Sequence, residues 1–169
     1  MTENFPKLYV YSYVEDQAHM YGHEDEIEPT LEALEAYYNE RVVDIYGDDD
    51  DDDDDDDDEY DYLGPIVVKM SFDKDLKMSK TAICRGCLEE TLQCIKDLYA
   101  ITMLFDELHI KYQHTNYGWF HIRIGGAVRE LRFSNRDKIV VGDPMWSSRI
   151  FLRTTFDTLR QDLINFMAQ

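Results

Sequence analysis

Two hydrophobic periods alternate along this chain, and together they predict its elements. Residues 7–14 alternate with a strand-like period of two. One face of that predicted strand carries Leu8, Val10, Ser12 and Val14, and the other carries Tyr9, Tyr11 and Tyr13. Residues 65–72 are apolar and rich in β-branched side chains, which predicts a second strand. The polar residues 73–80 predict a turn or loop.

A period of 3.6 residues predicts helices over residues 28–45 and 87–106. The first apolar stripe comprises Ile27, Leu31, Leu34, Tyr38, Val42 and Ile45, and the second comprises Leu88, Leu92, Ile95, Leu98, Tyr99 and Met103. The acidic residues around 24–28 suit the start of the first helix because the helix dipole favours negative charge there. A final amphipathic helix is predicted from Trp146, Ile150, Phe151, Leu159, Leu163 and Phe166.

Residues 108–141 predict a meander of about four short strands. Alternating segments at 108–114, 119–124 and 127–133 are separated by turn sequences, and residues 138–141 complete the set. Gly125-Gly126 suits a two-residue hairpin turn because both glycines tolerate positive φ. Strands joined by short turns imply an antiparallel sheet with helices packed on it.

The predicted fold class is therefore α+β. The antiparallel sheet would consist of the four-stranded C-terminal meander plus one or two N-terminal strands, and about three helices would cover it. A length of 169 residues with 44% hydrophobic composition suits one domain over residues 1–169. A flexible acidic loop at about 47–63 would interrupt that domain, because a block of like charges stays extended and solvated.

Charge is divided very unevenly along the chain, whose net charge is −19. Residues 1–63 hold 24 acidic and two basic residues, whereas residues 107–169 hold six acidic and nine basic ones. The overall balance argues against a free-standing nucleic-acid binder, which needs a cationic footprint. No apolar run approaches the roughly 20 residues of a membrane span. With no secretory signal in the first 14 residues, we expect a cytoplasmic protein without membrane partners.

Eleven consecutive aspartates dominate the acidic third of the chain. They are Asp48, Asp49, Asp50, Asp51, Asp52, Asp53, Asp54, Asp55, Asp56, Asp57 and Asp58. The run is either a solvated insertion or an acidic arm that meets a basic surface. After it, Tyr60, Asp61 and Tyr62 alternate carboxylate with aromatic ring, which suits a cationic groove that normally takes phosphates and stacked bases. The predicted first helix adds an acidic outer face with Glu32, Glu35 and Glu40.

These features lead to the first functional hypothesis, an acidic interaction protein. It would inhibit a basic partner, such as a nuclease or another nucleic-acid-handling protein, by occupying its cationic surface. The helix glutamates would give specificity and the aspartate run would raise the association rate. In composition alone the chain resembles immunity proteins against nuclease toxins and viral anti-defence proteins.

The second hypothesis places the function on the predicted meander. Its outward positions hold Lys111, Trp119, His121, Arg123 and Arg132, provided that the strands pair in the expected register. Basic residues interleaved with an aromatic ring on a sheet suit single-stranded nucleic acid. The chain would then be a weak nucleic-acid-binding module, inhibited by its own aspartate run. A plain solvated face is the alternative, and a buried Trp119 would exclude binding there. A third hypothesis is an acidic chaperone-like or scaffold subunit that self-associates.

The segment whose residue types most suggest chemical reactivity is the C-x-x-C tetrapeptide Cys84-Arg85-Gly86-Cys87. Over these four residues it is similar to the thioredoxin-like redox motif, and a helix N-terminus would lower a thiol pKa. Zinc is the other candidate, with His19 and His23 as partners, although structural zinc needs four ligands. With Cys94 the chain has three cysteines in all, which do not form a disulfide framework. Reduced thiols suit a reducing compartment.

No motif for an enzyme or a cofactor is present. The chain lacks a P-loop, a nucleophile elbow and an H-E-x-x-H zinc motif. A mobile run of aspartates does not hold carboxylates in the fixed geometry that acid–base catalysis needs. We therefore expect no enzymatic activity, no cofactor and no catalytic residues.

Overall fold

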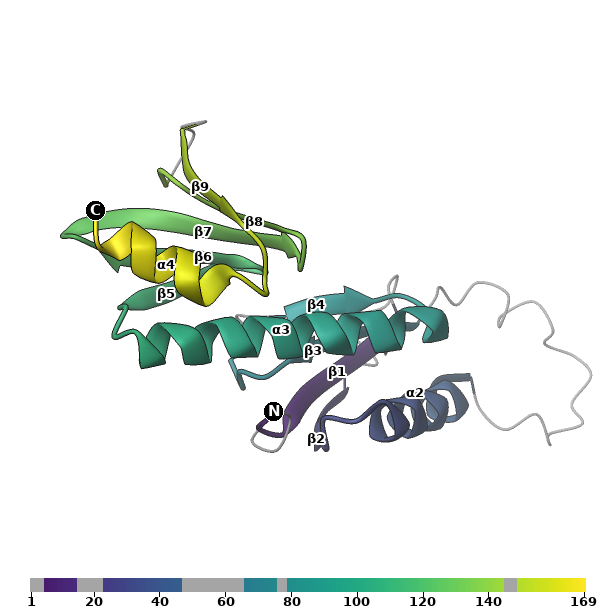
Figure 1. Ribbon diagram of the computed structural model, residues 1–169. Coiled ribbons are helices and arrows are strands. Elements are labelled where there is room, and N and C mark those ends of the chain that lie inside the picture. The colour runs from purple at the N-terminus through teal and green to yellow at the C-terminus, as the bar shows by residue number, and fades with distance from the viewer. Residues whose placement is uncertain (1–4, 15–22, 47–65, 76–78, 145–148) are drawn as a thin grey trace, which may run out of the picture. The chain divides into compact units, whose positions relative to one another are not determined.

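The computed structural model describes residues 5–14, 23–46, 66–75, 79–144 and 149–169 (Figure 1). The chain divides into two compact units, residues 1–95 (unit 1) and residues 96–169 (unit 2). The boundary lies inside helix α3 (Leu88–Glu107). The predicted acidic loop at 47–63 lies outside the described residues. No helix in the part of the chain that the structure describes is long and apolar enough to span a membrane.

Unit 1 is built on a four-stranded antiparallel sheet in the order β2-β1-β3-β4. Its strands are β1 (Leu8–Val14), β2 (His23–Ile27), β3 (Ile66–Ser71) and β4 (Ser79–Ala82). Helix α2 (Leu31–Tyr46) follows β2, and a short 3-10 helix η3 (Arg85–Cys87) leads into α3. The predicted strands at 7–14 and 65–72 and the predicted helices at 28–45 and 87–106 are confirmed to within a few residues.

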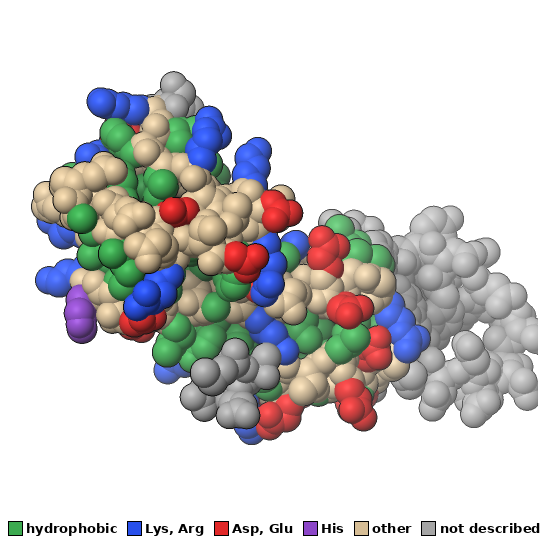
Figure 2. All heavy atoms as spheres, in the orientation of Figure 1, with side chains coloured by type: hydrophobic (Ala, Val, Ile, Leu, Met, Phe, Trp, Pro, Cys, Tyr) green, Lys and Arg blue, Asp and Glu red, His purple; other side chains and the backbone are tan. Residues whose placement is uncertain are grey.

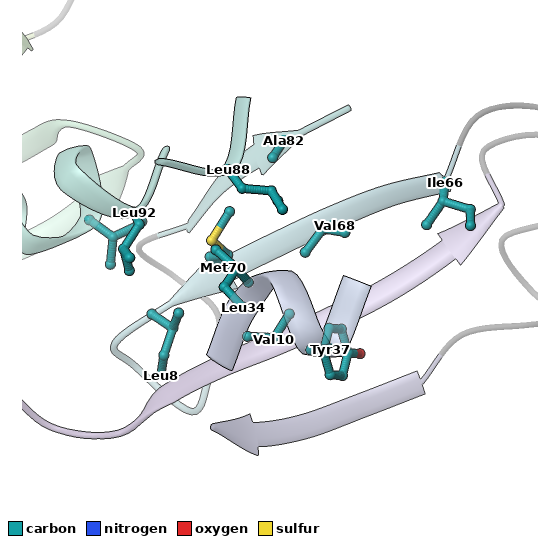
Figure 3. Close-up of a cluster of buried hydrophobic side chains, with 11 residues drawn as sticks. Leu8, Val10, Leu34, Tyr37, Ile66, Val68, Met70, Ala82, Leu88 and Leu92 are labelled. Carbon is teal, nitrogen blue, oxygen red and sulfur yellow. The ribbon is translucent and has the colours of Figure 1, made fainter. Parts of the chain in front are cut away.

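The core of unit 1 lies between the sheet and its helices, as Figure 3 shows. Leu8 and Val10 of β1 are fully buried, while Tyr9 and Tyr11 on the other face are half-buried. This matches the predicted division of β1 into two faces. Leu34 and Tyr37 of α2 belong to the same core. Most of its other members are Val68, Met70, Ala82, Leu88, Leu92 and Ile95. Burying these side chains stabilises unit 1 because apolar area leaves water.

Unit 2 is a five-stranded antiparallel meander in the order β5-β6-β7-β8-β9. Its strands are β5 (Tyr112–Asn116), β6 (Trp119–Ile124), β7 (Ala127–Asn135), β8 (Lys138–Gly142) and β9 (Ile150–Thr154), and helix α4 (Leu159–Met167) follows. Gly125 and Gly126 have φ values of 60° and 79°, as the predicted hairpin turn requires. In Figure 1, α4 crosses one face of this meander.

One face of the meander forms the core of unit 2. Phe120 and Ile122 of β6 are buried on this face, and the Phe105 ring of α3 lies 5.3 Å from the Phe120 ring. Leu159 and Leu163 of α4 are buried as well. The predicted α+β class with antiparallel pairing is confirmed, and the structure realises it as two sheets with three α-helices in the described residues.

Four local predictions are corrected by the structure. Ile150 and Phe151, predicted to be helical, belong to β9, and α4 begins only at Leu159. Residues 24–27, predicted to favour a helix start, form β2, which pairs with β1. Residues 79–82, at the end of a predicted loop, form β4 against β3. In each case pairing with a distant strand satisfies the backbone, which a local pattern does not reveal.

The fourth correction concerns the end of α3. The predicted strand at 108–114 begins only at Tyr112, because residues 108–110 complete the helix end. His109 adopts φ 55°, and the Ile110 N–H donates to the Phe105 carbonyl over 2.8 Å. The His109 N–H donates to the Asp106 carbonyl over 3.2 Å. This pair of bonds is a Schellman motif, in which the residue at the left-handed position is ordinarily glycine.

Candidate functional site

The pairing of β6 with β7 brings the predicted basic and aromatic residues together. Trp119 lies opposite Arg132, and His121 lies opposite Glu130. Since side chains alternate across a strand, Trp119, His121 and Arg123 lie on the face opposite the buried Phe120. The remaining predicted residue, Lys111, is next to β5, and its carbonyl accepts the Arg123 N–H over 2.9 Å.

The neighbouring strands extend this face in the same register. Val140 of β8 pairs with Arg132 on one side and with Arg153 of β9 on the other. Arg153 therefore points to the same side as Arg132. We call this surface the basic sheet face, and it consists of Lys111, Trp119, His121, Arg123, Arg132 and Arg153. It includes all five residues of the predicted nucleic-acid face.

The basic sheet face is open in the part of the chain that the structure describes. Trp119 is 41% exposed, which is high for the largest apolar side chain. Lys111, Arg123 and Arg153 are exposed, and His121 and Arg132 are half-buried. The condition set by the sequence, that Trp119 should not be buried, is therefore met. In the view of Figure 2, Lys and Arg side chains protrude around the end of the meander where β8 and β9 lie.

A row of paired side chains crosses the middle of this face. The Arg132 guanidinium stacks on the Trp119 ring, 4.7 Å from its centroid. The Arg132 Nε donates to the Glu130 Oε1, and His121 Nε2 lies 3.2 Å from Glu130 Oε2. The Glu130 side chain is only 6% exposed, so its carboxylate is held between two partners beneath the surface. This arrangement fixes Arg132, which in turn holds the Trp119 ring.

A shallow hollow lies on each side of this row. One, of about 220 Å³, is lined by residues that include Lys111, Gln113, His121, Arg123 and Val128. The other, of about 260 Å³, is lined by Glu130, Arg132, Val140, Gly142, Asp143, Arg149 and Ile150. In the second hollow, Asp143 Oδ1 accepts a hydrogen bond from Arg129 Nη1 over 2.8 Å. Arg149 is a further basic residue of its lining. Each hollow thus combines cationic side chains with apolar surface.

The local charge favours an anionic ligand here. By sequence, unit 2 holds ten basic and eight acidic residues, a net of +2, while unit 1 holds seven basic and 28 acidic ones, a net of −21. The acidic residue at the centre of the basic sheet face, Glu130, is already paired. Lys111, Arg123 and Arg153 are the exposed cations that remain to contact phosphates, while the Trp119 ring offers a surface for stacking.

The acidic residues of the first hypothesis lie in unit 1. Glu32 and Glu40 of α2 are exposed, and Glu35 is half-buried. Within the described residues, none of these three glutamates forms an ion pair with a basic side chain. The edge strand β2 adds three exposed acidic residues, Glu24, Asp25 and Glu26. The rest of the predicted acidic site, Asp48 to Asp58 with Tyr60, Asp61 and Tyr62, lies outside the described residues.

The two sulfur atoms of the cysteine motif lie closer together than two ligands of one zinc ion need to be. The Cys84 and Cys87 sulfur atoms lie 2.8 Å apart at the start of α3. His23 is the first residue of β2, and His19 lies outside the described residues. Among the described residues, no group of three or more His, Cys, Asp and Glu side chains is placed to hold a metal ion. The sulfur of the third cysteine, Cys94, accepts a hydrogen bond from Lys80 Nζ over 3.4 Å.

Sequence reasoning missed two parts of the basic sheet face. Arg153 was missed because β9 was predicted to be helical. The role of Glu130 was missed although a signal was present: a two-residue turn at Gly125-Gly126 places residue 130 opposite residue 121. No family model matches the chain, and neither curated proteins nor solved structures show a significant match to it.

Proposed function

We propose that this chain is a single-strand nucleic-acid-binding module and that its ligand lies on the basic sheet face. The observation that supports the proposal best is the exposed Trp119 ring, held by Arg132 on a sheet face with exposed cations. A flat sheet with an exposed aromatic ring accepts unstacked bases, and the surrounding cations contact phosphates. Binding at this face involves no catalytic step, and a cytoplasmic location suits such a module.

The affinity is expected to be weak, because the net charge of −19 repels a polyanion. The aspartate run at 48–58 is part of the same chain. In this proposal its carboxylates compete with phosphates for the cations of the basic sheet face. Deleting the run removes eleven negative charges and leaves a net charge of −8. Binding should therefore strengthen on deletion, most clearly at low salt where charges are least screened.

The test is a fluorescence anisotropy titration of labelled oligo(dT) and oligo(U), about 15 nucleotides long. Both the full chain and the chain lacking residues 48–58 are titrated at low salt. Trp119→Ala should weaken binding about tenfold, because one stacked base contributes ~1–3 kcal/mol. The matched control is Met167→Ala on α4, which is equally exposed at 41% and lies outside the face. Equal affinity of the Trp119 and Met167 variants, or no binding by the deletion variant, rejects the proposal.

The acidic interaction protein is a second candidate. It is favoured by the glutamates of α2, which form no ion pair with a basic side chain among the residues that the structure describes. We propose in this case that Glu32, Glu35 and Glu40 bind the cationic groove of a nuclease, with the aspartate run speeding association. The test is inhibition of a basic ribonuclease by the full chain. Changing the three glutamates to glutamine should abolish inhibition, whereas Glu89→Gln with Glu90→Gln, two exposed acids of α3, should not. Inhibition that both variants retain, or none by the full chain, rejects this candidate.

A further inference from the structure

The two thiols of the C-x-x-C motif face each other across a single tight turn. Cys84 is extended, with φ −140° and ψ 163°, and the chain then turns through η3 so that the Cys87 N–H donates to the Cys84 carbonyl over 3.0 Å. This turn places the two sulfur atoms 2.8 Å apart. A disulfide bond is about 2.05 Å long, so the sulfurs need to approach by only about 0.8 Å to form one.

The motif is open to a reaction partner. Cys84 is exposed and Cys87 is half-buried. The intervening Arg85 and Gly86 are exposed, and no heavy atom outside its own neighbours lies within 4 Å of the position where a Cβ on Gly86 would sit. A small disulfide-containing molecule can therefore reach the exposed Cys84. Cys84 is therefore the more accessible of the two sulfurs.

The surroundings assign different roles to the two sulfurs. The pKa of Cys84 is lowered, because the Cys87 thiol donates to its sulfur and the backbone N–H groups of Cys87 and Gly86 point at it. The pKa of Cys87 is raised by its bond to Cys84, by desolvation and by the negative charge of Glu90. Cys84 is therefore the more readily deprotonated of the two thiols, and Cys87 holds its proton more tightly.

We propose that Cys84 and Cys87 form a thiol–disulfide exchange site whose substrates are low-molecular-weight disulfides such as oxidised glutathione. The Cys84 thiolate attacks one sulfur of the substrate, the substrate S–S bond breaks, and the first half leaves as a thiolate. A mixed disulfide remains on Cys84. The Cys87 thiol then loses its proton to solvent and attacks the Cys84 sulfur. The second half leaves as a thiolate, and both leaving thiolates take protons from solvent.

The electron balance of this sequence is complete. Two cysteine thiols are oxidised to one disulfide, and one substrate disulfide is reduced to two thiols. The reverse reaction with a dithiol restores Cys84 and Cys87, so the site works as a reversible couple. The exchange site and the basic sheet face share no residue, because both cysteines belong to unit 1 and the face belongs to unit 2.

The test uses the full chain, oxidised glutathione and mass spectrometry of proteolytic peptides. The unmodified sequence should form a Cys84–Cys87 disulfide, retain no adduct and release two glutathione thiols per chain. Cys87→Ser should accumulate a stable glutathione adduct on Cys84. Cys84→Ser should form an adduct on Cys87 at least about tenfold more slowly, because the half-buried Cys87 sulfur is less accessible than that of Cys84. Cys94→Ser, the matched control, should behave like the unmodified chain.

Three results would overturn the proposal. One is an adduct that persists on Cys84 when Cys87 is present. Another is equal adduct rates in the Cys84→Ser and Cys87→Ser chains, both shown to be folded by circular dichroism. The third is metal binding instead: equimolar zinc protects both thiols from alkylation, while oxidised glutathione without zinc yields no internal disulfide.

Discussion

The hydroxyl groups of Ser12 and Tyr37 lie 3.1 Å apart in the core of unit 1 and form a hydrogen bond between β1 and α2. Ser12 is fully buried and Tyr37 is 4% exposed. Figure 3 shows the Tyr37 ring beside β1 among apolar side chains. A buried polar group is tolerated only when it is hydrogen-bonded, so each hydroxyl makes the other acceptable in this core.

Removing both of these hydroxyls should cost less than the sum of the two single losses. Tyr37→Phe leaves the Ser12 hydroxyl buried without this bond and should lower the free energy of unfolding by about 1–2 kcal/mol. Ser12→Ala should have a similar effect, and the double variant should lose less than the sum. Urea unfolding of the four chains gives the coupling energy, expected at about 1 kcal/mol. Additive losses would show that the bond contributes nothing.

The same tyrosine should make unit 1 sensitive to high pH. Burial raises the pKa of Tyr37, and the hydrogen bond from Ser12 only partly offsets this. Because the folded pKa exceeds that of the unfolded chain, the contribution of Tyr37 is fully present below about pH 10 and is lost as the pH rises through the folded pKa. The free energy of unfolding should therefore fall more steeply above pH 10 in the unmodified chain than in Tyr37→Phe. Parallel pH profiles would contradict this assignment.

A buried ion pair in unit 2 should contribute more than an exposed pair in the same unit. Arg136 binds Asp97 through two bonds, Nη2–Oδ1 at 2.6 Å and Nε–Oδ2 at 2.9 Å, and the Asp97 side chain is only 5% exposed. Arg136→Ala should cost about 2 kcal/mol, because a buried carboxylate loses both of these charge-assisted hydrogen bonds. The control is Arg160→Ala, whose exposed pair with Glu107 should contribute less than about 1 kcal/mol. Equal losses in urea unfolding would contradict the argument.

The left-handed residue at the end of α3 offers a stabilising substitution. His109 has φ 55° at the position of a Schellman motif where glycine has no steric penalty. Since this side chain is exposed, His109→Gly should raise the free energy of unfolding by up to about 1 kcal/mol. His109→Ala is the matched control and should not stabilise the chain, because it removes the imidazole but retains the Cβ. Thermal unfolding of the three chains checks this order.

The proposed ligand predicts a characteristic salt dependence. If Lys111, Arg123 and Arg153 each contact one phosphate, the logarithm of the association constant should fall with the logarithm of the salt concentration with a slope of about −2, since each contact to a single strand contributes about −0.7. Arg123→Ala and Arg153→Ala should each reduce this slope by about 0.7. Arg160→Ala removes the same charge away from the face and should leave the slope unchanged. Binding that is insensitive to salt would contradict phosphate contacts.

The hairpin of β6 and β7 illustrates how much of the candidate site is predictable from the sequence. The alternation of Trp119, His121 and Arg123 with apolar residues indicates the two faces, and Gly125-Gly126 indicates the register. These two local signals are sufficient to place Arg132 opposite Trp119. Arg153 is not predictable in this way, because residues 150–154 carry an apolar pattern that suits both a helix and a strand. Pairing with β8 decides between the two.

The sequence by itself determined the α+β class, the positions of α2 and α3, the two faces of β1 and the opposed pairs of the Gly-Gly hairpin. These features follow from side-chain periods and turn residues that act over a few positions of the chain. The tertiary structure alone decided that β2 and β4 join β1 and β3, that β9 extends the meander, and that Glu130 is buried between His121 and Arg132. The physical reason is that a strand gains its hydrogen bonds and its burial from segments far away in the sequence, so the free energy that selects it is absent from the local pattern.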